Sequence, residues 1–102
     1  METHHKKKLE IIVEAPLRGP LLDLLDQLGA TGYTVLSATC GRGHEGVWDM
    51  GQISEAGSMV LVICLTDSAR LEPMLDSIYE VLSGRIGIVY VSDVDVIRQD
   101  HF

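Results

Sequence analysis

The sequence is poor in aromatic residues, in basic residues and in cysteine, and the shortage of basic residues excludes a class of function. Its 102 residues include one tryptophan, three tyrosines and one phenylalanine. Eight lysines and arginines stand against fifteen aspartates and glutamates, so the formal net charge is −7. A chain this acidic lacks the basic footprint with which proteins displace counterions from nucleic acids. Non-specific nucleic-acid binding is therefore excluded.

The cysteine content and the short apolar runs restrict the class of protein further. Cys40 and Cys64 lie far apart without CxxC spacing, so we expect two reduced thiols. No apolar run approaches the roughly 20 residues of a membrane-spanning helix. The opening segment METHHKKK has no signal-peptide pattern, which predicts a cytoplasmic protein. With 46% hydrophobic and 23% charged residues, the chain has the composition of one globular domain.

Motifs of catalysis and of metal binding are also missing. No serine lies in a nucleophile elbow, and the chain has no P-loop. His44 stands beside Glu45 without a partner histidine, which argues against a zinc site. Nothing in the sequence marks Cys40 as a catalytic thiol. We therefore expect a protein that is not an enzyme and holds no metal.

Hydrophobic periodicity predicts four strands and two helices. Residues 8–15 alternate with period two, with Leu9, Ile11 and Val13 on one face. The leucines of residues 17–28 then follow a helical period, which Gly29 ends. The other expected elements are strands at 33–40, 58–66 and 86–91, a helix over 68–82 capped by Asp67 or Ser68, a long loop at 41–57, and a short edge strand around 94–97. This order predicts an α+β, ferredoxin-like βαββαβ fold: an antiparallel sheet with two helices on one face.

Two of the predicted strands are apolar on both faces, which a sheet with helices on one side does not require. In the strand at 58–66, Leu61 and Ile63 alternate with Val60 and Val62, and we assign Val62 to the face left open. An uncovered apolar sheet face marks an association surface. The sequence therefore predicts a homo-oligomer.

Three arginines, two of them beside glycines, are candidate anion-binding residues. Arg42 lies between Gly41 and Gly43 directly after a predicted strand, where successive backbone N–H groups can form an anion-binding nest. Arg85 follows Gly84 between the second predicted helix and the next strand, and Arg98 lies near the end of the sequence. A guanidinium group supplies a fork of donors that matches a phosphate.

Residues 8–91 resemble the PII signalling family. The resemblance is carried by LGATGYTV at 28–35, CGRG at 40–43 and SGRIG at 83–87, which are similar to the family's turn into strand two, its T-loop base and its B-loop. It implies a single PII-like domain over residues 1–102, with a T-loop at about 41–57. It also implies a homotrimer that binds an adenine nucleotide between subunits and signals without being an enzyme.

The chain also departs from the nitrogen-regulatory members of that family. Its T-loop is several residues shorter and has no tyrosine, its B-loop runs directly from Gly87 into Ile88, and the paired C-terminal arginines are reduced to Arg98. These departures argue against ATP and 2-oxoglutarate sensing. The chain looks more like the PII-like branch associated with bicarbonate uptake and carboxysomes, whose members favour AMP, ADP or cyclic AMP.

That likeness implies AMP or ADP as ligand, bicarbonate as a second ligand, and a role in inorganic-carbon metabolism. It further implies a transporter or a carboxysome-related protein as partner, and a carboxysome association within the cytoplasm. Trp48 and Met50 in the loop are expected to contact that partner. The expected nucleotide-binding residues are Gly32, Thr34, Gly41, Arg42, Gly43, Gly84, Arg85, Ile86, Gly87 and Arg98.

Within this set, the strand edge at Gly32 and Thr34 would receive the base, and the three arginines would neutralise the phosphate. Two alternatives remain open. A CutA-like trimer would be a metal-tolerance protein, and an ACT-like domain would sense an amino acid.

Overall fold

The structure of the chain, a computed structural model, describes residues 1–43, 46–49 and 58–100. Four antiparallel strands form one sheet in the order β2-β5-β1-β6, and two further strands form a separate hairpin, β3-β4. The elements along the chain are β1 (His4–Glu14), a 3-10 turn (Ala15–Leu17), α1 (Arg18–Gln27), β2 (Tyr33–Ala38), β3 (Cys40–Gly43), β4 (Gly46–Asp49), β5 (Met59–Thr66), α2 (Ser68–Leu82) and β6 (Gly87–Val96). The ferredoxin-like α+β fold expected from the periodicity is confirmed.

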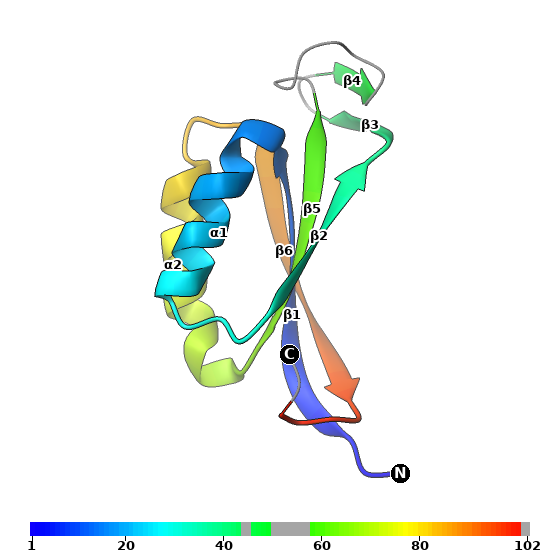
Figure 1. The fold of residues 1–102 in the computed structure, drawn as a ribbon, viewed down its shortest axis with the longest axis vertical. Helices are drawn as coiled ribbons and strands as arrows, with labels where there is room; N and C mark the ends of the chain where they lie inside the picture. The colour runs from blue at the N-terminus through cyan, green and yellow to red at the C-terminus, as the bar shows by residue number, and fades with distance from the viewer. Residues whose placement is uncertain (44–45, 50–57, 101–102) are drawn as a thin grey trace.

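Both helices pack on the same face of the sheet, and the hydrophobic core lies between the two layers (Figure 1). Leu9, Ile11 and Val13 of β1 have no exposed surface, which confirms the predicted alternation. From the helices, the fully or almost fully buried residues are Leu21, Leu25, Met74 and Ile78. Neither described helix is long and apolar enough to cross a membrane.

The ends of the helices form as the sequence predicts. Gly29 follows α1 with a φ of 78°, and the Ala30 N–H donates to the Leu25 carbonyl at 3.0 Å, which completes a Schellman motif. At the start of α2, Asp67 is the N-cap rather than Ser68, since its side chain accepts the Arg70 N–H at 2.9 Å. Arg70 also donates to the Gly29 carbonyl at 3.0 Å and so ties α2 to the end of α1.

Two predicted boundaries were wrong because glycines and charges weaken the strand signal. The predicted loop at 41–57 begins with the β3-β4 hairpin, in which Gly41 pairs with Trp48 and Arg42 with Val47. Glycine is depleted in strands, so this hairpin carries little sequence signal. The predicted edge strand around 94–97 is the end of β6, which runs on to Val96.

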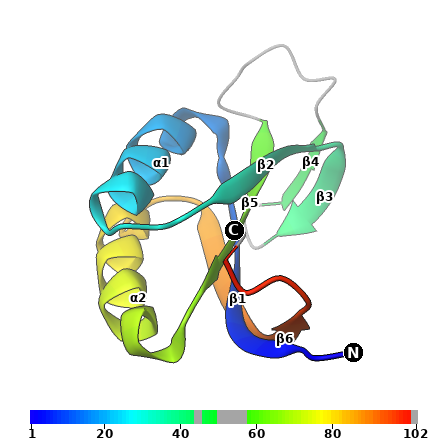
Figure 2. The ribbon, with the colours of Figure 1, turned by 60° about the horizontal axis from the view of Figure 1, so that its bottom comes forward.

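The extra length of β6 pairs with an extra length of β1. The polar start of β1 was predicted to lie outside the strand, but His4 pairs with Val96 and Lys6 with Val94. As Figure 2 shows, these two segments extend together beyond the helices, near the N-terminus. Backbone pairing therefore extends the sheet through a stretch in which side-chain periodicity is lost.

The sheet face opposite the helices, here called the open face, is lined by side chains of all four strands: Lys8, Glu10, Ile12, Thr34, Leu36, Leu61, Ile63, Leu65, Ile88 and Tyr90. Leu36 is 47% exposed and Ile88 57% exposed. More than half of the side chains on the open face are therefore apolar, as predicted. Val62, however, was assigned to the wrong side: it is fully buried and points toward the helices.

Candidate functional site

Most of the expected nucleotide-binding residues gather at the end of the sheet that carries the β3-β4 hairpin, here called the hairpin end. Gly41, Arg42 and Gly43 belong to β3 itself. The turn from α2 into β6 lies at the same end, because the Glu14 N–H donates to the Ile86 carbonyl at 3.4 Å. Arg42 and Arg85 lie at this end, and Arg85 is exposed. Figure 1 shows the hairpin and the turn at the top of the molecule.

The glycines at this end differ in what they do for the backbone. Gly84 has a φ of 73°, a conformation that other residues adopt at a cost. A Cβ on Gly87 would lie 3.0 Å from the Ile12 carbonyl oxygen and 3.0 Å from Val13 Cγ1, so a side chain here would crowd β1. Gly41 and Gly43 lie in a paired strand. The nest geometry expected around Arg42 is therefore not the geometry of this structure.

Gly32, Thr34 and Arg98 lie at or toward the other end of the sheet. Gly32 directly precedes β2, and Thr34 lies on its open face. Arg98 follows β6, whereas Arg85 precedes it. Ten strand residues at about 3.3 Å each separate the two arginines. One subunit therefore does not bring Arg98 together with Arg42 and Arg85.

A hollow of about 300 Å³ lies beside Gly32, at the end of the sheet away from the hairpin. It is lined by Lys6, Ala30, Thr31, Leu65, Thr66, Asp67, Arg70, Gln99 and Asp100. Lys6 and Arg70 bring positive charge to it, Asp67 and Asp100 bring negative charge, and the hydroxyl-bearing Thr66 is only 8% exposed. These residues were not predicted from the sequence as a site. Two signals in the sequence do point to parts of its lining: the turn between α1 and β2, and the helix cap at Asp67.

Two polar networks lie on β1 and β6. On the open face, the Tyr90 hydroxyl donates to Glu10 Oε2 at 2.9 Å, and Lys8 Nζ lies 3.2 Å from Glu10 Oε1. The hydrogen bond from Tyr90, and next that from Lys8, holds the pKa of Glu10 below its usual value.

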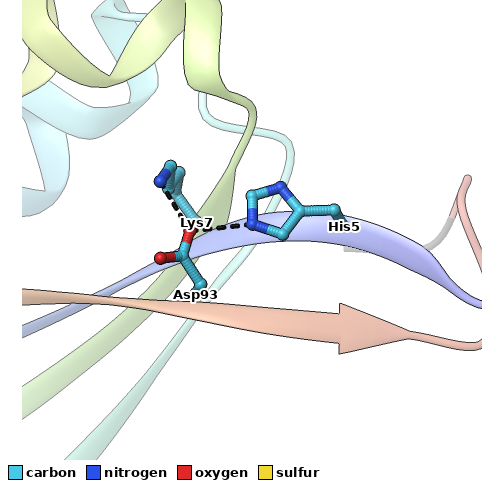
Figure 3. Close-up of polar contacts among 3 residues, drawn as sticks. All are labelled: His5, Lys7 and Asp93. Carbon is cyan, nitrogen blue, oxygen red and sulfur yellow. Dashed lines mark hydrogen bonds and ion pairs between the residues drawn. The ribbon is translucent and has the colours of Figure 1, made fainter.

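The second network joins the extended ends of the same two strands, as Figure 3 shows. Asp93 Oδ1 lies 2.5 Å from Lys7 Nζ and 2.7 Å from His5 Nε2. These two contacts lower the pKa of Asp93, and the contact with Lys7 has the larger effect. The ion pair between Lys7 and Asp93 thus joins β1 to β6 near the ends of the two strands.

The remaining candidates are distributed through the fold. Trp48 lies in β4 opposite Gly41, while Met50, His44 and His101 lie outside the described residues. Cys40 is exposed and Cys64 buried; both are free thiols, and burial raises the pKa of Cys64. Within 1–43, 46–49 and 58–100, no three His, Cys, Asp or Glu side chains are grouped to hold a metal ion. The metal-tolerance and amino-acid-sensing alternatives gain no support.

Comparison with known proteins identifies a family that covers most of the chain. Residues 6–101 match the nitrogen regulatory protein P-II family. No sequence among the curated proteins matches the chain.

Solved structures agree with the family match. The chain is similar to CPII, a nitrogen regulatory PII-like protein from Thiomonas intermedia K12, bound to ADP, AMP and bicarbonate: 28% identity over 95% of this chain and 92% of the other, with a TM-score of 0.86. The apo form of that protein shares 26% identity, covers 93% and 95%, and has a TM-score of 0.76. A PII-like signalling protein from Thermus thermophilus shares 25% identity, covers 96% and 95%, and has a TM-score of 0.80.

Proposed function

Because this chain belongs to the nitrogen regulatory protein P-II family, we propose that it is a non-enzymatic signalling protein that binds AMP or ADP between subunits. Bicarbonate is its second ligand, and the T-loop at about 41–57 carries the signal in inorganic-carbon metabolism. The whole chain acts as one PII-like domain in the cytoplasm, where its partner is a transporter or a carboxysome-related protein. Trp48 and Met50 contact that partner.

The observation that carries this proposal is the likeness to CPII. The similarity extends over 95% of the chain, and that protein is bound to ADP, AMP and bicarbonate in one structure and to ADP and bicarbonate in another. The features that distinguish this chain from nitrogen-regulatory PII proteins, the short T-loop and the short B-loop, agree with the same branch.

The placement of the arginines supports a site between subunits. Arg42 and Arg85 lie at the hairpin end and Arg98 at the other, so a phosphate that contacts all three must lie between two chains. Gly32, which directly precedes β2 and lies beside the hollow lined by Thr31 and Thr66, is suited to contact the base.

The open face supports the association of several copies, and the assembly proposed is a homotrimer. Stable interfaces bury about 800 Å² on each partner, and apolar surface of that extent contributes about 20 kcal/mol before the costs of association. Leu36, Ile12, Leu61 and Ile88 supply a row of such surface across all four strands.

Calorimetry tests the nucleotide site. AMP, ADP, ATP and cyclic AMP are titrated with and without bicarbonate, and we expect AMP or ADP to bind most tightly. Arg42→Ala should weaken ADP binding about ten- to hundred-fold, because a charge-assisted hydrogen bond contributes about 1.5–3 kcal/mol. Arg42→Lys restores the charge without the fork and should recover part of the affinity.

Arg18→Ala is the matched control, since Arg18 is an exposed arginine at the start of α1 in the helix layer. Absence of binding by every adenine nucleotide would overturn the proposed function. Wild-type affinity in Arg42→Ala would leave nucleotide binding in place and remove Arg42 from the phosphate site.

A further inference from the structure

The open face carries a polar network in which each group already has a partner within the subunit. Each oxygen of the Glu10 carboxylate has its own donor, Oε2 the Tyr90 hydroxyl at 2.9 Å and Oε1 the Lys8 ammonium at 3.2 Å. The set is also neutral, because the Lys8 charge balances that of Glu10. Both side chains are partly exposed, and such a pair in contact with water contributes little to stability.

The strand register places this network directly beside the apolar part of the face. Glu10 pairs with Ile63 on one side and Tyr90 on the other. The next row toward the hairpin end is apolar on all four strands: Leu36, Leu61, Ile12 and Ile88. On the open face, this apolar row therefore lies next to the polar network of Lys8, Glu10 and Tyr90.

This division matters once water is removed. A carboxylate that is buried without donors costs far more than one that is paired, so the network can enter an interface only as a complete set. A second copy whose apolar row slides over Glu10 would cover the charged pair with hydrocarbon and leave the apolar row of the first copy in water. One position of the second copy on the open face therefore has a lower free energy than positions displaced along the strands.

We infer that Lys8, Glu10 and Tyr90 fix the position in which a second copy of this chain packs against the open face. The inference rests on the proposed homo-oligomer and deepens it. The network acts on specificity more than on affinity, because an apolar replacement of similar volume often associates as tightly as a buried charged set.

Three variants separate these effects. Tyr90→Phe removes one donor from Glu10, and Glu10→Gln leaves the Lys8 charge without a carboxylate. The triple variant Lys8→Met, Glu10→Leu and Tyr90→Phe replaces the network with hydrocarbon. Tyr79→Phe is the control, because Tyr79 is 73% exposed on α2, away from the open face. Stoichiometry is measured by native mass spectrometry and dissociation by sedimentation, with circular dichroism to verify folding.

We expect Tyr90→Phe and Glu10→Gln to dissociate about ten- to hundred-fold more readily than wild type. The triple variant should associate as tightly as wild type but in several stoichiometries, and Tyr79→Phe should match wild type. A single stoichiometry in the triple variant, or unchanged dissociation in both single variants, would overturn the inference. A monomeric wild type at micromolar concentration would overturn the proposed assembly as well, while titration with ADP reports the nucleotide function separately.

Discussion

At the scale of single residues, a glycine in a binding motif can be required by the fold alone. Gly87 lies in the SGRIG stretch that resembles the B-loop, and a methyl group at this position would crowd Ile12 and Val13. Loss of nucleotide binding after substitution at this position would therefore not identify a ligand contact. Stability has to be measured beside affinity.

Gly87→Ala is expected to lower the free energy of unfolding by about 1–3 kcal/mol, because the added methyl group overpacks against the β1 backbone. Urea denaturation measures the change. Gly19→Ala is the matched control: no atom lies within 4 Å of its added Cβ, and alanine favours the helix. Equal stability of the Gly87→Ala protein and the wild type would contradict the packing argument.

Asp93 is expected to titrate below the ordinary aspartate pKa of 3.8, because Lys7 and then His5 stabilise its charged form. A pKa that is lower in the folded than in the unfolded state stabilises the fold above the unfolded value. This contribution is lost as the pH falls through the folded value. Carboxyl NMR measures the midpoint. Lys7→Met should raise it toward 3.8, and His5→Phe should raise it less; an unmoved midpoint in Lys7→Met would contradict the ion pair.

At the scale of elements, the start of α2 depends on one side chain. Asp67→Ala should cost about 1 kcal/mol, because it removes the acceptor of the Arg70 N–H. Asp67→Asn keeps an acceptor and should cost less. Ser68→Ala, at the other residue the sequence allowed as cap, should change the urea midpoint little; a larger loss there than in Asp67→Ala would reverse the cap assignment.

The sequence predicted the elements whose apolar residues recur with a regular period. The two helices and the buried alternation of β1 follow from repeated apolar positions, and Gly29 and Asp67 mark helix ends by their chemistry. The β3-β4 hairpin was missed because three of its eight residues are glycine. Val62 was assigned to the wrong face because a strand that is apolar on both faces does not indicate which one the helices cover.

The site was less predictable than the fold, for a physical reason. Arg42, Arg85 and Arg98 were expected to neutralise the phosphate of a nucleotide bound between subunits, and the direction of β6 places Arg98 at the opposite end of the sheet from the other two within one subunit. Sequence spacing does not report this separation. The hollow beside Gly32 was missed because its walls come from separate segments of the chain, far apart in sequence.

At the scale of the whole molecule, two ligands bound to one site must affect each other equally. If bicarbonate tightens ADP binding by some factor, ADP must tighten bicarbonate binding by the same factor. Calorimetry in which chloride is exchanged for bicarbonate at constant ionic strength measures both. Trp48, the single tryptophan, reports the hairpin by its fluorescence. An ADP affinity that bicarbonate does not change would remove the second ligand from the proposal.

The central position of β1 has a consequence for synthesis on the ribosome. β1 pairs with β5 and β6, which are both made after it, and Glu10 and Tyr90 are 80 residues apart in sequence. Contacts of such separation slow folding, since a long segment must be ordered before they form. In the nascent chain, the apolar strand β1 therefore has no strand to pair with until β5 has been made. A nascent chain arrested after Leu82 should be digested readily by protease, and one that also contains β6 outside the exit tunnel should resist.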